Sequence, residues 1–494
     1  MQNPPGEDSL FPGGFFMRYN DNRSADMQSK RYFKPMNKTI TQITTGDMMH
    51  VHGGFGAGVD YTVRISARMK DKVDADILRA ALDRTQSCYP CFLVRIRKDE
   101  RAFYYESNPL PVALLHTDSR IRLDSEETNH HVWAVCYMED MIHLDFYHGI
   151  TDGTGMYRVL ATLLYEYCKD RYGVTDHEGI RIPGDPVMTE DILDPQDLIL
   201  KDDPAAAAEG GSVSSEQPSA DAPADSSADT PADAPADPPA DAPAGLMPAF
   251  TLETDGGLTP SDPTIWDVMI PEDAFVRFTS ANDSSPGTMV SLLMAKAIDS
   301  LYPQRDKEIV SAYVINARPM LQAPKTLHNC LGMALFTYSD RVRAMPFTRQ
   351  CTVYRGMTFV QSDEDRIKAA TGANAGAIRA ATAASPSIEE KKKVFGQMFQ
   401  GGEGLVTYLV SYTGKWKYPV LGDHMREFWL HPPNTFSLMV EIGAAAGSIF
   451  LSIQQRFMED TVREAFLRIL QEHGIPYRVS RRMKSDIARF HEPD

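Results

Sequence analysis

The sequence predicts an α+β protein built from two lobes. At 494 residues the chain is too long for a single compact core. Patterns typical of strands and of helices are interleaved along it, without the strict strand–helix–strand rhythm of a doubly wound sheet, which favours mixed sheets with flanking helices. A long segment rich in Ala, Pro and Asp interrupts the chain near its middle. The elements on either side of this segment are therefore assigned to separate lobes.

The sequence before the interruption contains both strand-like and helix-like hydrophobic patterns. Apolar side chains recur at every second position in the strands and at helical spacing in the helices. The last helix of this half carries an apolar stripe and ends at Gly173, a residue typical of helix C-termini. The predicted elements are a strand within 61–74, a helix over 75–88, strand pairs within 91–107 and 130–149, and a helix over about 156–172.

The same kinds of element return after the interruption. Residues 443–447 (GAAAG) suit the turn of a hairpin, and the helix that closes the lobe is amphipathic. The predicted elements are a helix over 288–302, strands within 308–320 and 331–342, a hairpin over 434–457 and a helix over 459–474.

The interruption itself cannot bury a core. Residues 221–245 (DAPADSSADTPADAPADPPADAPAG) contain no aromatic or β-branched aliphatic residue, which predicts a disordered, extended spacer between lobes. A docking tail for a basic partner is the alternative. The predicted organisation is an N-terminal extension (1–39), an N-terminal lobe (40–200), the linker (201–247), a C-terminal lobe (248–485) and a tail (486–494).

Charge and composition argue against several classes of protein. The net charge is −17, but residues 202–245 hold ten acidic residues and no Lys or Arg, so the remainder is only mildly acidic. No basic face suggests a nucleic-acid partner. Six scattered cysteines fit reduced thiols, and neither a signal peptide nor an apolar run long enough to span a membrane is evident. These features predict a cytoplasmic protein.

Residues 146–153 (FYHGITDG) carry the strongest chemical signal. On the preceding strand, Ile142, Leu144 and Phe146 share one face with His148, so the imidazole is expected at the rim of the core. A neutral imidazole in such a place can accept a proton near pH 7, as a general base must. Asp152 follows across a glycine-flanked bend. On these residues alone, a satisfied core histidine beside a turn aspartate is an equally good interpretation.

Other histidines give weaker signals. His50 and His52 lie in a glycine-rich stretch, expected to be a loop, that could be imagined as a metal or phosphate site, yet no P-loop lysine completes it. His130 and His131 are adjacent and would face opposite ways on a strand, so they could not bind one metal together, and we expect them to be surface residues. No metal site is predicted. Residues 372–387 suit either a small-residue helix interface or a mobile loop, and 477–490 a solvated C-terminal helix.

The HGITDG stretch resembles the HxxxDG signature of the chloramphenicol-acetyltransferase-like superfamily. That family includes peptide-synthetase condensation domains, plant acyltransferases of the HxxxD type and alcohol O-acetyltransferase-like proteins. The resemblance covers roughly residues 40–175 and 260–475. Further matching segments stand in the expected order: residues 72–96, 314–320 (VINARPM), 328–333 (HNCLGM) and 410–416 (VSYTGKW).

The resemblance implies a pseudo-dimer of two similar lobes, with a central tunnel that reaches His148 from both faces. His148 would deprotonate an acceptor hydroxyl, amine or thiol, which attacks an acyl thioester directly. Asp152 would pair with Arg318 and hold the loop. The resemblance also places Gly153 and Asn316 in support of the site, and Tyr147, Ser411, Tyr412 and Gly414 along the substrate tunnel.

Two departures from the family bear on the substrate. Tyr147 replaces the first histidine of the double-His signature of condensation domains, and the DFGWG motif of the plant enzymes is absent. No carrier or adenylation domain adjoins. These features favour a free-standing acyltransferase that uses acyl-CoA as co-substrate, a small alcohol or amine as acceptor and no tightly bound cofactor. The alternatives are a condensation-like protein that takes its acyl group from a carrier protein, and a non-catalytic binding scaffold.

Overall fold

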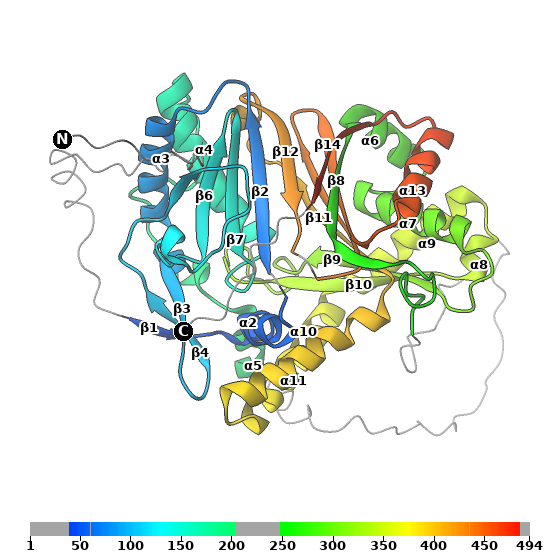
Figure 1. Cartoon of the computed structure of the whole chain (residues 1–494), viewed down its shortest axis with the longest axis horizontal. Coiled ribbons are helices and arrows are strands. Elements are labelled where there is room, and N and C mark those ends of the chain that lie inside the picture. The colour runs from blue at the N-terminus through cyan, green and yellow to red at the C-terminus, as the bar shows by residue number, and fades with distance from the viewer. Residues whose placement is uncertain (1–38, 60, 203–247, 434, 485–494) are drawn as a thin grey trace, which may run out of the picture.

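The computed structural model describes residues 39–59, 61–202, 248–433 and 435–484 (Figure 1). These residues form an α+β structure with three sheets and flanking helices, as predicted. The predicted linker 201–247 lies outside the described residues except for residues 201–202, which finish a helix. Most of the N-terminal extension and the whole of the tail also lie outside them.

The N-terminal lobe is built on a five-stranded sheet. Helices α3 (Ala75–Cys88) and α4 (Gly153–Tyr172) pack against each other beside it, and α4 ends at Gly173 in the left-handed conformation, as expected. Every residue of β7 is buried, so neither face of this strand meets solvent. The strand order is β12 (Met425–His431), β2 (Thr62–Met69), β7 (Met141–Tyr147), β6 (Trp133–Met138) and β5 (Leu114–His116).

The C-terminal lobe is built on a seven-stranded mixed sheet. Its core is separate from that of the N-terminal lobe and is formed largely by α7, α13 and the central strands. The strand order is β10 (Leu331–Tyr338), β9 (Ile309–Asn316), β11 (Tyr408–Lys415), β13 (Leu438–Ala445), β14 (Ser448–Phe457), β8 (Pro260–Pro271) and β15 (Arg478–Lys484). Its helices are α6 (Glu272–Ala281), α7 (Pro286–Leu301), α8 (Asp340–Arg343), α9 (Phe347–Gln361) and α13 (Thr461–Glu472). Helix α12 (Pro419–Gly422), from the same half of the chain, packs instead against α4 and β12 of the N-terminal lobe.

One strand of the second half of the chain belongs to the sheet of the first lobe. β12 lies beside β2 (Figure 1) and pairs with it antiparallel. Phe428 and Trp429 of β12 are buried in the N-terminal core. At the end of the strand, His431 Nε2 lies 3.1 Å from Asp267 Oδ1 on β8 of the other sheet. The two lobes are thus joined by backbone pairing as well as by side chains.

A layer of helices lies below both sheets in Figure 1, beside a small sheet of β1 (Ile40–Gln42), β4 (Phe103–Ser107) and β3 (Val94–Lys98). Helices α2 and α11 of this layer approach each other closely at Gly56, where a Cβ atom would lie only 1.9 Å from the carbonyl oxygen of Lys392. The layer consists of α2 (Thr45–Ala57), α5 (Pro195–Asp202), α10 (Glu364–Ala384) and α11 (Ile388–Gly401).

Several expectations from the sequence are corrected here. The glycine-rich stretch around His50 is helix α2 rather than a loop, because its glycines allow α11 to pack closely against it. Most of residues 372–387 is helical, so the helix interpretation was the better one. The basic segment from Arg478 to Lys484 is strand β15, paired with β8, and not a helix. His131 is fully buried, with Nε2 2.7 Å from the carbonyl oxygen of Leu110.

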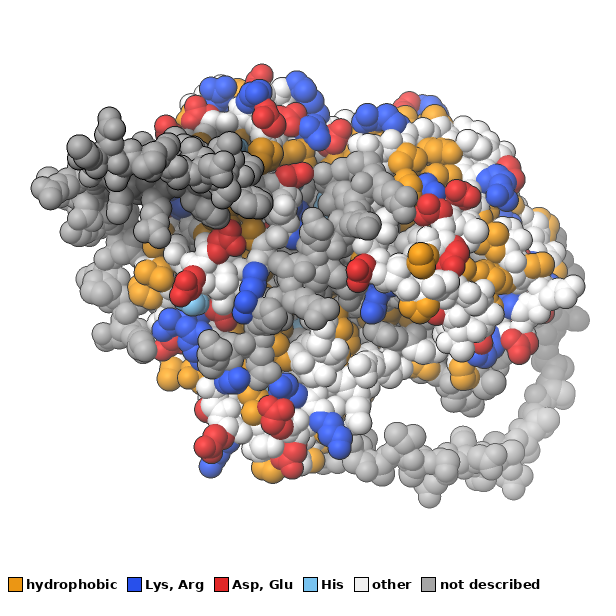
Figure 2. All heavy atoms as spheres, viewed as in Figure 1, with side chains coloured by type: hydrophobic (Ala, Val, Ile, Leu, Met, Phe, Trp, Pro, Cys, Tyr) orange, Lys and Arg blue, Asp and Glu red, His pale blue; other side chains and the backbone are white. Residues whose placement is uncertain are grey.

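Charged side chains of both signs are interspersed on the face shown in Figure 2, and no broad basic surface stands out there. Within the described ranges, no helix has the length and apolar character needed to cross a membrane.

Candidate functional site

His148 lies directly after β7, where the chain turns toward α4. Its backbone N–H donates to the carbonyl oxygen of Tyr61, 2.9 Å away. Asp152 then caps α4, its Oδ1 accepting a hydrogen bond from the backbone N–H of Gly155 at 2.9 Å. This cap begins the helix at Gly153, earlier than the apolar pattern predicts. A strand end and a helix start thus hold the histidine between two fixed elements.

Gly153, the last residue of the motif, and Gly155 just after it lie close against the C-terminal lobe. A Cβ atom at Gly155 would lie 2.1 Å from Thr151 Oγ1 and 2.7 Å from the carbonyl oxygen of Leu327. At Gly153 it would lie 2.9 Å from Thr413 Cγ2. The absence of a side chain at these positions lets the two lobes approach closely beside His148.

Asp152 and Arg318 form a bidentate ion pair between the lobes. Arg318 Nη1 lies 2.8 Å from Asp152 Oδ2, and Nη2 lies 2.9 Å from Oδ1. Both side chains are almost fully buried, with 2% and 1% exposed. Burial opposes ionisation of Asp152, but the charge and hydrogen bonds of Arg318 hold the pKa of this carboxyl below its usual value. The ion pair that the resemblance implied is therefore present.

Arg318 uses its remaining donors on the backbone around it. Nε donates to the carbonyl oxygen of Thr326 at 3.0 Å, and Nη2 to that of His328 at 2.9 Å. Asn316 Oδ1 accepts from the backbone N–H of Arg318 at 3.2 Å and lies 3.3 Å from Nη1. Asn316 thus contacts Arg318 rather than His148, so any effect it has on the histidine passes through the arginine.

The imidazole of His148 is half-buried. Its Nδ1 is buried and has no hydrogen-bond partner among the described residues. Burial lowers the pKa of His148, while its own backbone carbonyl and the charge of Asp152 act in the opposite direction. The ring is consequently neutral near pH 7 and able to accept a proton.

A second interlobe contact lies beside the first and was not predicted from the sequence. Asn329 Nδ2 donates to the carbonyl oxygen of His148 at 3.0 Å and lies 3.1 Å from Asp47 Oδ1. Asp47, on α2, also pairs with His328 at 2.9 Å. Burial acts to lower the pKa of His328, but the attraction of Asp47 prevails and raises it to about 9.

The two histidines of α2 have different surroundings. His50 stacks on His148, with ring centroids 5.5 Å apart. His52 instead contacts Phe103 and Phe395 and serves packing. The structure does not bring the two together as a pair of ligands, and no cluster of three metal-ligating side chains occurs in the part of the chain that is described.

The residues assigned to the substrate tunnel fall into two groups. Tyr147 is buried, and its hydroxyl donates to the carbonyl oxygen of His50 at 3.3 Å. Ser411, Tyr412 and Gly414 lie on β11, and Gly414 has a φ of +91° where the strand changes register. The structure does not show a continuous tunnel past them, so their contact with substrate stays a prediction.

Glu441 is a further acidic group near β11 that the sequence did not single out. It stands opposite Ser411 on the neighbouring strand β13. Burial raises the pKa of Glu441 to about 7, and a hydrogen bond with Ser411 acts to lower it. Its burial depends on the pairing of β11 with β13, which no local pattern reveals.

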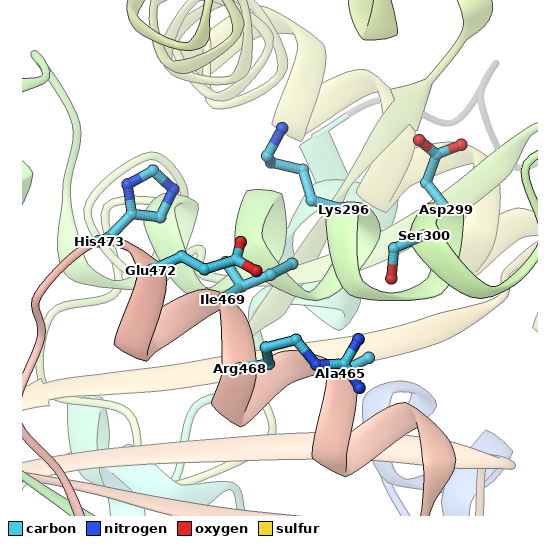
Figure 3. A pocket seen from close by; sticks show the side chains of 8 residues that line it. All are labelled: Lys296, Asp299, Ser300, Ala465, Arg468, Ile469, Glu472 and His473. Carbon is cyan, nitrogen blue, oxygen red and sulfur yellow. The ribbon is translucent and has the colours of Figure 1, made fainter.

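A cleft of about 390 Å³ opens between the lobes at the start of α4. Thr154, Tyr157 and Arg158 of α4 line one side, and Asn316 and Thr413 are among the residues of the other. Another hollow, of about 240 Å³, lies between α7 and α13 and is lined mainly by charged and polar side chains (Figure 3). It contains none of the residues predicted from the sequence.

Comparison with known proteins identifies the fold. No family model matches the chain, and no curated protein matches it. Solved structures do match. A first condensation domain of the calcium-dependent antibiotic synthetase, in complex with a substrate analogue, shares 14% identity at a TM-score of 0.54 and covers 92% of this chain and 100% of its own.

Two fungal proteins have the same architecture. The trichothecene 15-O-acetyltransferase TRI3 of Fusarium sporotrichioides shares 10% identity at a TM-score of 0.53, over 88% of this chain and 94% of its own. TRI101 of F. sporotrichioides, solved with coenzyme A and T-2, shares 11% identity at a TM-score of 0.50, over 87% of this chain and 97% of its own. The chain therefore has the fold of condensation domains and these acetyltransferases, as the sequence resemblance implied.

Proposed function

We propose that the protein transfers an acyl group from an acyl-CoA to a hydroxyl or amine acceptor, with His148 as general base. The observation that carries this proposal is the position of His148, a neutral and half-buried imidazole on a loop fixed by the Asp152–Arg318 pair. A non-catalytic binding scaffold of the same fold would have no need of a buried ion pair that holds this loop in place.

The chemistry requires one proton to move twice. His148 takes the proton from the acceptor's O–H or N–H while the acceptor atom bonds to the thioester carbonyl carbon. The tetrahedral intermediate then collapses, the carbon–sulfur bond breaks, and the imidazolium returns the proton to the departing thiolate. No acyl-enzyme forms, because the acceptor attacks the donor directly. Asp152 and Arg318 hold the loop and do not touch substrate.

The interlobe cleft supports coenzyme A as the carrier of the acyl group. Arg158 points its guanidinium at the carbonyl oxygens of Pro324 and Lys325, at 2.6 Å each, so no carboxylate neutralises it in these contacts. Lys417 is exposed at the same cleft. Cationic side chains of this kind bind phosphate groups. TRI101, which shares the fold, is solved with coenzyme A.

The proposal is tested by offering the purified protein a panel of acyl-CoA thioesters with small alcohols and amines, and measuring free thiol release and product mass. We expect transfer by the wild type and a loss of about a hundred- to ten-thousand-fold in His148→Ala, with an unchanged melting temperature. Transfer from acylated carrier protein alone would favour the condensation-like alternative. Absence of transfer from either donor, or equal turnover by the variant, would contradict the proposal.

A further inference from the structure

Three aromatic rings meet at the reacting end of β7, and one of them is a second imidazole. His50 stacks on His148 at 5.5 Å with an interplanar angle of 29°, and Tyr61 lies 5.1 Å from His148. His50 also stacks on Tyr61 at 5.4 Å, and its Nδ1 lies 3.1 Å from the Tyr61 hydroxyl. The second imidazole comes from helix α2, about a hundred residues earlier in the chain.

We infer that His50 is a second catalytic residue, a neutral hydrogen-bond donor that stabilises the oxyanion formed while His148 acts as base. The inference rests on the proposed function and goes beyond it, since it assigns a residue outside the HGITDG motif. The attacking atom and the oxyanion of a tetrahedral intermediate are bound to the same carbon. The groups that serve them must therefore lie close together, as the two stacked imidazoles do.

In this assignment the Tyr61 hydroxyl is the donor and His50 Nδ1 the acceptor of the hydrogen bond between them. Burial raises the pKa of Tyr61, so its phenol stays protonated and can donate to His50 Nδ1. An imidazole that accepts at Nδ1 carries its proton on Nε2. Burial and the neighbouring His148 lower the pKa of His50 to about 4, so the ring is neutral at pH 7. A neutral imidazole donor can serve an oxyanion without competing with His148 for the proton.

The position of α2 is fixed from three sides. The Tyr147 hydroxyl donates a hydrogen bond to the backbone carbonyl of His50, so the residue that replaces the first histidine of the double-His signature contacts the helix carrying the second imidazole. Asp47, one turn earlier, is tied to His328 and Asn329 of the other lobe. On the opposite side, the glycines of α2 pack against α11. His50 is therefore held as rigidly as a preorganised hydrogen-bond donor must be.

The test compares substitutions that keep the ring, keep the donor or remove both. His50→Phe keeps the stacking and volume without a donor, and His50→Gln restores an amide N–H close to the Nε2 position. Tyr61→Phe keeps its ring but removes the hydroxyl that sets the tautomer. His52→Phe is the matched control on the same helix, because His52 packs against Phe103 and Phe395 and away from His148.

We expect kcat to fall about a hundredfold in His50→Phe with little change in KM, to recover at least tenfold in His50→Gln, and to stay at the wild-type value in His52→Phe. Tyr61→Phe should lie between wild type and His50→Phe. Melting temperatures verify that each variant folds. Wild-type kcat in His50→Phe, or a Gln variant as slow as the Phe variant, would overturn the inference while leaving the proposed function intact. An inactive wild type would instead contradict the proposed function.

Discussion

Two buried arginine–aspartate pairs start from the same short stretch of chain, and they serve different ends. Asp145, on β7, pairs with Arg64 on the neighbouring strand β2, with Arg64 Nε 2.6 Å and Nη2 2.7 Å from its two carboxylate oxygens. Asp152, seven residues later, also forms a bidentate pair, with Nη1 and Nη2 of Arg318 from the other lobe. Each pair is nearly inaccessible to solvent.

The difference lies in what each pair connects. Arg64 and Asp145 are already opposite each other in the register of β2 and β7, so their ion pair reinforces an arrangement that the backbone ladder holds. No ladder joins Arg318 to Asp152. Their pair, with the Cys330 N–H bond to Asp152 Oδ2 at 3.0 Å, fixes the loop of His148 against the second lobe. The same chemistry stabilises a sheet in one place and positions a side chain in the other.

The largest expected effect comes from breaking either pair. Asp152→Asn, Arg318→Gln and Arg64→Gln should each cost about 3–5 kcal/mol in the free energy of unfolding, because the surviving polar or charged partner is left unpaired away from water. Only the first two should also slow acyl transfer per folded molecule. Denaturant unfolding and turnover, corrected for the folded fraction, give the two readouts.

A double-mutant cycle sharpens the comparison. Asp152→Asn with Arg318→Gln should be little worse than either change alone, in both stability and rate, because one interaction is lost in all three. Strictly additive losses, or an equal loss of turnover in Arg64→Gln, would mean that the interlobe pair has no special role at His148.

The second interlobe contact, between Asp47 and His328, should make a pH-dependent contribution to stability that is somewhat smaller than the loss expected from breaking either arginine–aspartate pair. The pKa of His328 in the folded protein is raised to about 9 from its usual value near 6.5. Its pairing with Asp47 therefore contributes stability that is full below about pH 6.5 and is lost as pH rises through about 9, at most about 2–4 kcal/mol. Unfolding free energies measured from pH 6 to 10 should fall in the wild type. The slope should be absent in His328→Gln; a persistent slope would contradict this role of His328.

The smallest expected loss of stability distinguishes Gly153, which ends the motif, from Gly155 two residues later. Gly155→Ala should destabilise the protein by about 1–3 kcal/mol, since its Cβ would meet the backbone oxygen of Leu327. Gly153→Ala should cost less, because its Cβ would meet only a side-chain methyl group of Thr413, which can move. Thermal melts of the two variants test the order. A larger loss at Gly153 would show that the lobes approach differently beside His148.

Much of the fold could be predicted from local pattern. Strand β7 and helices α3 and α4 follow from hydrophobic period and capping. The pairing of Asp152 with Arg318 was implied only by the family resemblance carried by HGITDG and by Asn316–Pro319 (NARP). Helix α2 could not be predicted, because its glycines weaken a helix and are explained only by the close approach of α11. β15 is a strand for a similar reason: only its pairing with β8 decides it.

The residues of the candidate site also differ in how far the sequence could predict them. His148 stands in a motif that can be recognised in the sequence alone. His50 and His328 are brought near His148 only by contacts between segments far apart in the chain. The pairing of Arg64 with Asp145 could not be predicted either, because an aspartate and an arginine on separate strands give no signal until the register of the strands is known.

The account depends most on His148 acting as the base, and the pH dependence of acyl transfer tests this directly. Since burial lowers the pKa of His148, kcat/KM should rise with pH through an apparent pKa below 6.5 and be level at neutral pH. His148→Asn should lose transfer by at least a hundredfold and, in what activity remains, this rise. Unchanged transfer by the variant, or a wild-type rate that rises only well above pH 7, would contradict the assignment.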